Sequence, residues 1–157
     1  MPNWFYLFFN ALYHLGLALW IGGSIALGAL VAPALFRSLP RYEAGGIFGP
    51  ILRRFARLRV AALVMIVAGA GAKFLRWETH AATPWLVIRW IAITVLAFDL
   101  VYEIVFLEKP MQALRAGLGP DVPADDPGRL RFNALHRRAE GLMKASIVAA
   151  FVALLFS

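Results

Sequence analysis

The chain has 157 residues, 61% of them hydrophobic, and a mean hydropathy of +0.70. Only 16% of its residues are charged, too few for the surface of a soluble domain. The composition therefore predicts an integral membrane protein whose partner is the lipid bilayer. The net charge of +7 comes from basic residues beside apolar runs, so nucleic acid is not an expected partner. Without cysteine, the chain has no disulfide, thiolate metal site or nucleophilic thiol.

Four apolar stretches are long enough, with their flanking turns, to cross a bilayer. The pairs Gly49-Pro50, Thr83-Pro84 and Asp126-Pro127 each place a proline where a helix favours it, at the first position. No low-complexity tract or internal repeat divides the chain. We therefore predict an all-α integral membrane four-helix bundle, a single domain over residues 1–157, with helices at about 3–37, 50–77, 84–109 and 127–157.

Basic residues are distributed unevenly around these predicted spans. Six arginines separate the first two spans and seven basic residues follow the third, but only Lys73 and Arg76 end the second. The positive-inside rule then predicts a multi-pass cell-membrane protein with loops 38–49 and 110–126 in the cytoplasm and both termini on the outer side. No Lys or Arg precedes Arg37, so the first apolar run is expected to be an uncleaved membrane helix.

Small residues spaced four apart predict where the helices pack against one another. They are Ala18, Gly22 and Ala26 on the first span and Ala145, Ala149 and Ala153 on the fourth. Pro33 is expected to kink the inner end of the first span.

Charged side chains at membrane depth are the most informative residues, because each costs roughly 2.5 to 3.5 kcal/mol at a helix centre. Asp99 and Glu103 share one face of the third span, and His136, Glu140 and Lys144 share one face of the fourth. One interpretation is an ion pair between Lys144 and either carboxylate that joins the two spans. Another is a proton or cation relay that opens toward His136 and Glu140. A third is a metal site of Glu103, His136 and Glu140.

His14 is predicted to point into the bundle from the outer half of the first span. Hydrogen-bonded packing is the ordinary role of such a histidine, but a neutral imidazole in a membrane bundle can also ligate haem or copper. Arg89, Lys73 and Arg76 either snorkel to headgroups or line an anion-attracting vestibule. No Ser–His–Asp order, phosphate-binding glycine loop or HExxH motif is present, so hydrolytic enzyme activity is not predicted.

Three segments together resemble a known family: the opening from His14 to Trp20 followed by LFRSLPR (35–41), LEKP (107–110) and FNALHRRAEGLMKAS (132–146). The chain resembles the transmembrane protein 205 family and its bacterial relatives, a domain of unknown function. The resemblance covers most of the chain and implies a four-helix membrane protein with His14 and His136 at the positions of two recurrent histidines. This chain has Ala139, and Met143 or Lys144, where such proteins commonly have a Ser and then an Asn.

A shorter resemblance rests on the HLGLALWIGG run (14–23) and Pro33. This pattern is similar to copper-resistance membrane domains and to the membrane protoporphyrinogen oxidase family, which are small bundles with an early histidine. Those oxidases also have a functional lysine, for which this chain offers no convincing equivalent.

Three functional hypotheses follow. The first is a site or pathway for a small solute, proton or metal ion at Asp99, Glu103 and Lys144, linked to metal or drug resistance. Because four helices enclose little volume, this hypothesis favours a homo-oligomer. The second is a haem- or copper-binding protein in redox chemistry or cofactor handling, with His14 as a ligand. The third is an accessory structural subunit of a larger membrane complex, docked through its small-residue faces and basic ends.

Overall fold

A computed structural model describes residues 3–79, 83–119, 122–123 and 125–157. Within these ranges the chain is helical apart from short connections, and it has no strand, so the all-α prediction is confirmed. The predicted connection between the second and third spans and the predicted 110–126 loop include residues 80–82, 120–121 and 124, which lie outside the described residues. The predicted loop is wrong over residues 110–117, which are helical.

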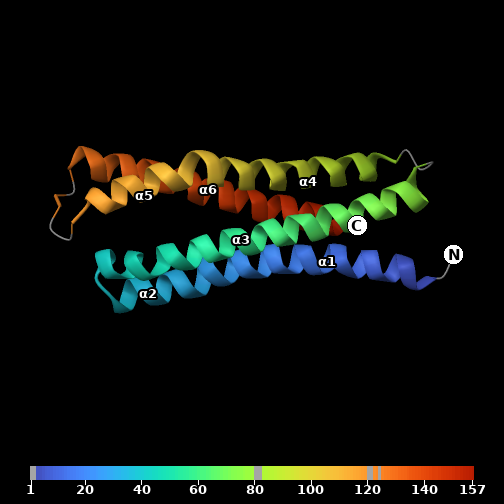
Figure 1. Ribbon diagram of the computed structural model, residues 1–157, viewed down its shortest axis with the longest axis horizontal. Coiled ribbons are helices and arrows are strands. Elements are labelled where there is room, and N and C mark those ends of the chain that lie inside the picture. The colour runs from blue at the N-terminus through green and yellow to red at the C-terminus, as the bar shows by residue number, and fades with distance from the viewer. Residues whose placement is uncertain (1–2, 80–82, 120–121, 124) are drawn as a thin grey trace.

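The described elements join into four long helical segments (Figure 1). The first consists of α1 (Asn3–Ile25), the π-helical η1 (Ala26–Val31) and α2 (Ala32–Ser38). The second consists of α3 (Arg41–Lys73) and the π-helical η2 (Phe74–Glu78). The third consists of α4 (Pro84–Tyr102), the π-helical η3 (Glu103–Leu107) and α5 (Glu108–Gly117), and the fourth is α6 (Pro127–Leu155).

The start of α3 differs from the sequence-based expectation. The helix begins at Arg41 rather than at Pro50, which lies inside it. Pro40 stands just before the helix with an extended ψ of 144°, and its carbonyl accepts from the Ala44 N–H at 2.9 Å. Pro40 therefore begins the helix, and Pro50 is accommodated at the loss of one backbone donor.

Three of the segments are long and apolar enough to cross a membrane: Trp4–Ser38, Arg41–Glu78 and Pro84–Gly117. Charged residues recur along the first half of α6 up to Lys144, and α6 does not meet the same criterion. The described helices are thus compatible with a membrane protein, and the fourth span stays a prediction.

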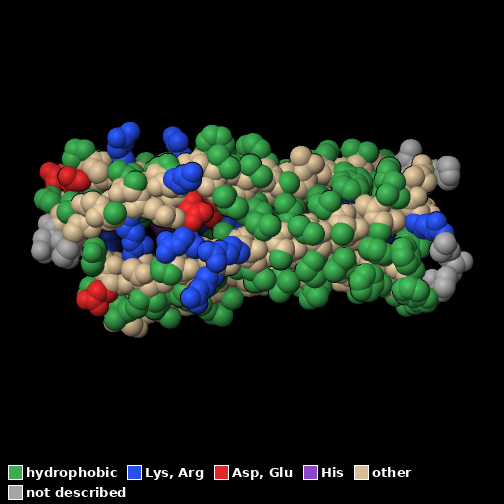
Figure 2. All heavy atoms as spheres, viewed as in Figure 1, with side chains coloured by type: hydrophobic (Ala, Val, Ile, Leu, Met, Phe, Trp, Pro, Cys, Tyr) green, Lys and Arg blue, Asp and Glu red, His purple; other side chains and the backbone are tan. Residues whose placement is uncertain are grey.

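The segments are arranged as two antiparallel hairpins (Figure 1). α1 packs along α3, α4 packs along α6, and the hairpins meet where α1 contacts α6 and α3 contacts α4. The turn between α2 and α3 lies at the same end as the connection between α5 and α6, whereas both chain termini lie toward the other end. Figure 2 shows Lys and Arg side chains gathered mostly at the end with these two connections, and a mainly hydrophobic surface beyond them. We call this the basic end.

The core consists of one face each of α1, α3, α4 and α6, and it brings together aromatic, aliphatic and small side chains. Its members are Tyr13, Leu17, Trp20, Ile21, Ala62, Ile66, Ala70, Ala92, Ile93, Leu96, Leu100, Ala149, Ala150 and Ala153. Two of the three alanines predicted to face other helices from α6 are therefore buried, and the third, Ala145, is exposed.

Glycines bring α1 and α3 into close contact. A Cβ atom on Gly16 would lie 2.7 Å from the Ala62 carbonyl oxygen, and one on Gly69 would lie 2.7 Å from the Phe9 carbonyl oxygen. Real Cβ atoms do not approach backbone so closely, so each position needs a residue without a side chain.

The predicted small-residue face of the first span is wrong. Ala18 and Gly22 are exposed, and a Cβ atom on Gly22 would meet nothing within 4 Å. The large core residues Tyr13, Leu17 and Trp20 lie on the opposite side of α1. Spacing alone identified a small-residue stripe, but the size of the aromatic and aliphatic residues decided which face is buried.

The predicted disturbance at Pro33 takes the form of a π-helical turn. η1 ends two residues before Pro33, and the N–H of Ala32 bonds to the Leu27 carbonyl five residues back. Proline cannot donate a backbone hydrogen bond, and a wider turn beside it is one way to accommodate that loss.

Replacing Gly69 with alanine is expected to destabilise the protein by about 1 to 3 kcal/mol, because the new methyl group would overpack the α1–α3 contact. Gly71→Ala is the matched control, since a Cβ atom there meets nothing within 4 Å and the helix propensity gain is the same. Thermal unfolding of both variants in detergent measures the difference. Equal melting temperatures would contradict the close approach.

Candidate functional site

Polar side chains are buried at two levels of the bundle. The buried polar residues among those described are Ser24, Arg59, Lys73, Arg89, Asp99 and Ser146. Arg59 and Lys73 both lie on α3, and their separation of 14 residues corresponds to about 21 Å along the helix. We call the group of Arg59, Asp99 and Glu103 the Arg59 cluster, and the group of Lys73, Asn10, Arg89 and Glu78 the Lys73 cluster.

The Arg59 cluster joins α3 to the third helical segment through one guanidinium and two carboxylates. Arg59 Nη1 donates to Asp99 Oδ2 at 3.5 Å, and Nη2 donates to Glu103 Oε2. The Arg59 and Asp99 side chains are 4% and 3% exposed, whereas that of Glu103 is 24% exposed. The Arg59 guanidinium also lies over two aromatic rings, 5.5 Å from the centroid of Trp20 and 5.4 Å from that of Phe55.

Helical periodicity places these residues on the inner faces of their helices. Phe55, Ala62 and Ile66 are buried on the same side of α3 as Arg59, at spacings of four, three and seven residues. On α4, Asp99 follows the buried Leu96 by three residues. Arg59 and Asp99 therefore belong to the buried stripes of two neighbouring helices.

The charges of the Arg59 cluster do not balance. Two carboxylates face one guanidinium, so the fully ionised cluster has a net charge of −1. Asp99 Oδ1 is buried and has no hydrogen-bond partner among the described residues, and the same holds for Arg59 Nε. An unpaired buried oxygen with surplus negative charge is costly, and binding a cation relieves this cost.

Two successive hydrogen bonds connect the Arg59 cluster to α6. The Trp20 indole, whose ring faces Arg59, donates from Nε1 to Ser146 Oγ at 3.4 Å. Ser146 in turn donates to the Met143 carbonyl at 3.0 Å. Trp20 thus contacts both the cation and the fourth helical segment.

The Lys73 cluster lies nearer the chain termini. Lys73 is 2% exposed, and its ammonium donates to Asn10 Oδ1 at 3.1 Å. Its Nζ lies 5.2 Å from the ring centroid of Tyr13 and 5.9 Å from that of Tyr6. The Tyr13 hydroxyl donates to the Ala153 carbonyl at 2.6 Å, which fixes the ring between α1 and α6.

Arg89 adds a paired cation at the same end. Its Nη1 donates to Glu78 Oε1 at 3.0 Å and its Nη2 donates to Glu78 Oε2, which is the two-pronged geometry of a strong Arg–carboxylate pair. With Lys73, Arg89 and Glu78 ionised, these three residues have a net charge of +1. Snorkelling is therefore the wrong interpretation for Lys73 and Arg89, because both are buried, whereas Arg76 is exposed.

His14 is engaged at both ring nitrogens. Nδ1 lies 2.7 Å from the Asn10 carbonyl oxygen, and Nε2 lies 3.2 Å from Ser157 Oγ. This geometry fits the packing role considered for His14, with Nδ1–H as donor and Nε2 as acceptor. Across the described residues, no three His, Asp or Glu side chains are placed to share a metal ion.

The structure separates the polar residues predicted on the fourth span from those on the third. His136, Glu140 and Lys144 are exposed, and Lys144 Nζ donates to Glu140 Oε1 at 2.7 Å. The hydrogen bond and the charge of Lys144 lower the pKa of the Glu140 carboxyl. The predicted pairing of Lys144 with Asp99 or Glu103 is wrong.

Helix geometry explains this correction. Lys144 precedes the buried Ser146 by two residues, which places it about 200° away around α6. Lys144 therefore faces away from the third segment, and Arg59 from α3 takes its place beside the carboxylates. His136 stacks on Phe132 of its own helix, with the two rings inclined by 5°.

Sequence reasoning missed two residues of the clusters. In the sequence, Arg59 is one of the six arginines that predict topology, and Glu78 lies just after the predicted second helix. The signal for Arg59 was available, since it continues the buried period of α3. The π-helical turn that contains Glu78 left no comparable pattern.

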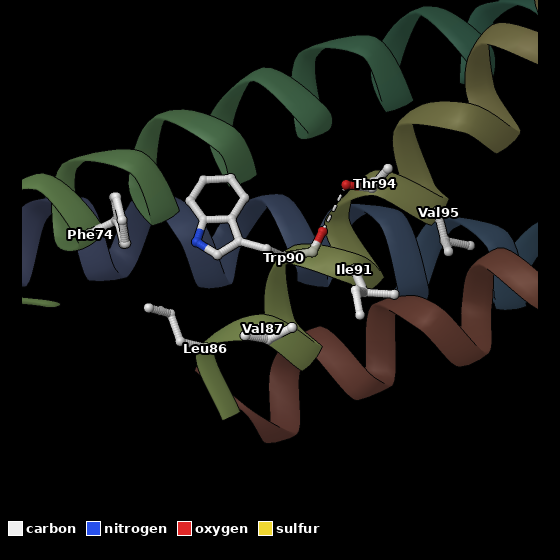
Figure 3. Close-up of a pocket in the computed structure, with 7 residues that line it drawn as sticks. All are labelled: Phe74, Leu86, Val87, Trp90, Ile91, Thr94 and Val95. Carbon is white, nitrogen blue, oxygen red and sulfur yellow. Dashed lines mark hydrogen bonds between the residues drawn. The ribbon is translucent and has the colours of Figure 1, made fainter. Parts of the chain in front are cut away.

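An open groove of about 480 Å³ lies on the outer side of α4, near η2. Figure 3 shows the side chains that line it. It is lined by Phe74, Leu86, Val87, Trp90, Ile91, Thr94 and Val95. No charged side chain lines it, and the Thr94 hydroxyl donates to the Trp90 carbonyl of its own helix at 2.9 Å. The groove suits an acyl chain better than a polar solute.

The fold and the buried charges define the class as a small helical protein with membrane-compatible helices and internal ion pairs. The family model named DUF4149, a domain of unknown function, matches residues 15–117, and the chain belongs to this family. No curated protein and no solved structure shows a significant match to the chain. The narrower resemblance to the transmembrane protein 205 family stays a prediction.

Arg59→Gln is expected to destabilise the protein by about 3 to 5 kcal/mol, because it leaves the buried Asp99 and the half-buried Glu103 without a cation. Arg57→Gln, an exposed position on the same helix, is the matched control and should change stability little. Adding Asp99→Asn and Glu103→Gln to Arg59→Gln should restore much of the loss. Thermal unfolding in detergent that found all variants equal would disprove the pairing.

Proposed function

We propose that this protein binds a proton at the Arg59 cluster and couples its uptake and release to the movement of a small solute or ion across the membrane. The observation that carries the proposal is the unpartnered Oδ1 of Asp99, in a buried cluster where two carboxylates share one guanidinium. Intramembrane carboxylates of this kind often serve proton relays.

A proton is the cation that fits this position. The groove on the outer side of α4 is lined by other residues, and so is a second groove, between α5 and α6. Asp99 lies in a packed core. A proton needs no cavity of its own. Protonation of Asp99 would leave a neutral Arg59–Glu103 pair, which removes the surplus negative charge without moving a helix.

The Lys73 cluster supports a path that extends along the bundle. The two clusters have opposite surplus charges, −1 around Arg59 and +1 around Lys73. A proton that left the Lys73 ammonium and reached the Asp99 carboxylate would neutralise both. Buried apolar residues such as Leu17, Ile66 and Leu96 belong to the core between the helices, so such a transfer would require a change in packing that admits water.

The proposal includes a topology with four spans. The rings of Trp85, at the start of α4, and Phe156, just after α6, stack with centroids 5.3 Å apart. α6 also contributes Ala149, Ala150 and Ala153 to the core, so it would lie in the bilayer wherever α4 does. Under the positive-inside rule, the basic end faces the cytoplasm and both termini lie outside.

The solute path would need more than one copy of the chain. Four closely packed helices enclose little space, and the helices described here pack through glycine and alanine. A homo-oligomer would provide a path between subunits, with the Arg59 cluster as the proton site in each. The resemblance to the transmembrane protein 205 family agrees with this proposal in fold, and resistance to toxic metals or drugs is the process that we would test first.

Asp99→Asn is expected to abolish proton binding at the cluster, because an amide cannot ionise. The measurement is the infrared band of a protonated carboxylic acid, followed as the pH is raised in lipid vesicles that contain the full-length protein. The wild type should lose this band on titration, and Asp99→Asn should lack it. Glu140→Gln is the control, because Glu140 is exposed and paired with Lys144.

The same vesicles, loaded with a pH-sensitive dye, measure proton entry after a pH gradient is imposed. Entry should fall at least tenfold in folded Asp99→Asn protein and persist in Glu140→Gln. If Asp99→Asn behaved like the wild type in both measurements, Asp99 would not be the proton site and the proposal would fail.

The topology can be tested separately, because the chain has no native cysteine. In intact cells, a membrane-impermeant maleimide should label Ser157→Cys but not Ser38→Cys, since these exposed residues lie toward opposite ends of the bundle. Lysis should make Ser38→Cys reactive. Labelling of Ser38→Cys alone before lysis would reverse the orientation, and equal labelling of both would rule out the four-span arrangement.

A further inference from the structure

An open groove at the basic end is unrelated to the proton site proposed above. It lies between α5 and α6 and has a volume of about 680 Å³. It is lined by Pro110, Ala113 and Leu114 of α5 and by Arg131, Ala134, Leu135 and Arg138 of α6. The groove therefore combines an apolar floor with two basic side chains.

The two arginines lie on one face of α6. Arg131 and Arg138 are seven residues apart, or about 10 Å along the helix, and Ala134 and Leu135 lie between them on the same face. Both arginines are exposed, and neither forms an ion pair with any acidic side chain among the described residues. Two cations thus flank an apolar strip without a counter-charge.

The position of the groove relative to the bilayer indicates which anion it would meet. The groove residues of α5 begin at Pro110, directly after the apolar residues 104–107 of η3 and the charged pair Glu108 and Lys109. This change from apolar to charged residues marks where a span of the third segment would leave the hydrocarbon and enter the headgroup layer. Figure 2 shows other basic side chains at the same end of the molecule. The nearest abundant anions at this level are lipid phosphates.

We propose that this groove binds one anionic phospholipid. The phosphate would lie between Arg131 and Arg138, whose guanidinium groups match phosphate oxygens in shape and charge. The glycerol and the first methylene groups would lie over Ala113, Leu114 and Leu135. This arrangement uses both features of the groove, whereas an acidic peptide would use the arginines but leave its apolar floor in contact with water.

The experiment uses the full-length protein in detergent and two fluorescent lipids with the same acyl chains, an anionic phosphatidylglycerol and a zwitterionic phosphatidylcholine. The wild type should bind phosphatidylglycerol roughly tenfold more tightly than phosphatidylcholine. Arg131→Gln combined with Arg138→Gln should abolish this preference. The matched control combines Arg54→Gln and Arg57→Gln, which removes two exposed arginines from α3 and should keep the preference.

A second variant separates a defined groove from general electrostatic attraction. Ala134→Trp fills the floor without changing the charge, and it should weaken phosphatidylglycerol binding about as much as loss of the two arginines. Soluble glycerol phosphate should not displace the lipid, because it cannot contact the floor. Equal losses in the α3 control, unchanged binding by Ala134→Trp, or displacement by glycerol phosphate would each overturn the proposal. Self-association of the protein through the groove would also overturn the proposal, as would displacement of the lipid by an acidic peptide.

Discussion

Burial of Arg59 between the hairpins is the constraint that the rest of the structure satisfies. Inside a bundle of apolar helices a guanidinium finds no water, so its counter-charges must come from a neighbouring helix. Asp99 and Glu103 supply them from the third segment. This contact fixes the register of α3 against α4, two helices that pack together less extensively than α1 with α3 or α4 with α6. Close glycine contacts then hold α1 on α3, and alanines hold α6 against the core.

Two of the three acidic partners share a local feature that the cations lack. Glu78 ends η2 and Glu103 begins η3, whereas Arg59, Lys73 and Arg89 all lie in regular α-helix. A π-helical turn adds a residue to the helix and shifts every later side chain around the axis. Glu78 and Glu103 meet their arginines at such turns, whereas Asp99 meets Arg59 from the regular helix α4. The same departures from regular helix that position these acids are of a kind often found at functional sites.

The two clusters give the bundle an unusual distribution of charge. One surplus negative charge is buried toward the basic end and one surplus positive charge is buried toward the termini. A purely structural network has no need of surplus charge at either level, because balanced pairs are cheaper to bury. The proton proposal rests on this imbalance. Asp99 and Lys73 carry the surplus charges, whereas Arg89 and Glu78 neutralise each other.

The helical class, the three apolar segments and the burial of Asp99 could all be predicted from the sequence, since hydropathy and helical period act along a single chain. The charge distribution predicted that the two basic connections lie on one side of a membrane, and Figure 1 shows them at one end of the bundle. Which side chains pair across helices depends on the tertiary structure. Lys144 lies on the exposed face of α6, and α1 buries the face that contains the bulky Tyr13 and Trp20. Arg59, from the neighbouring helix α3, pairs with Asp99. Pairing across helices depends on register and rotation, which no single helix encodes.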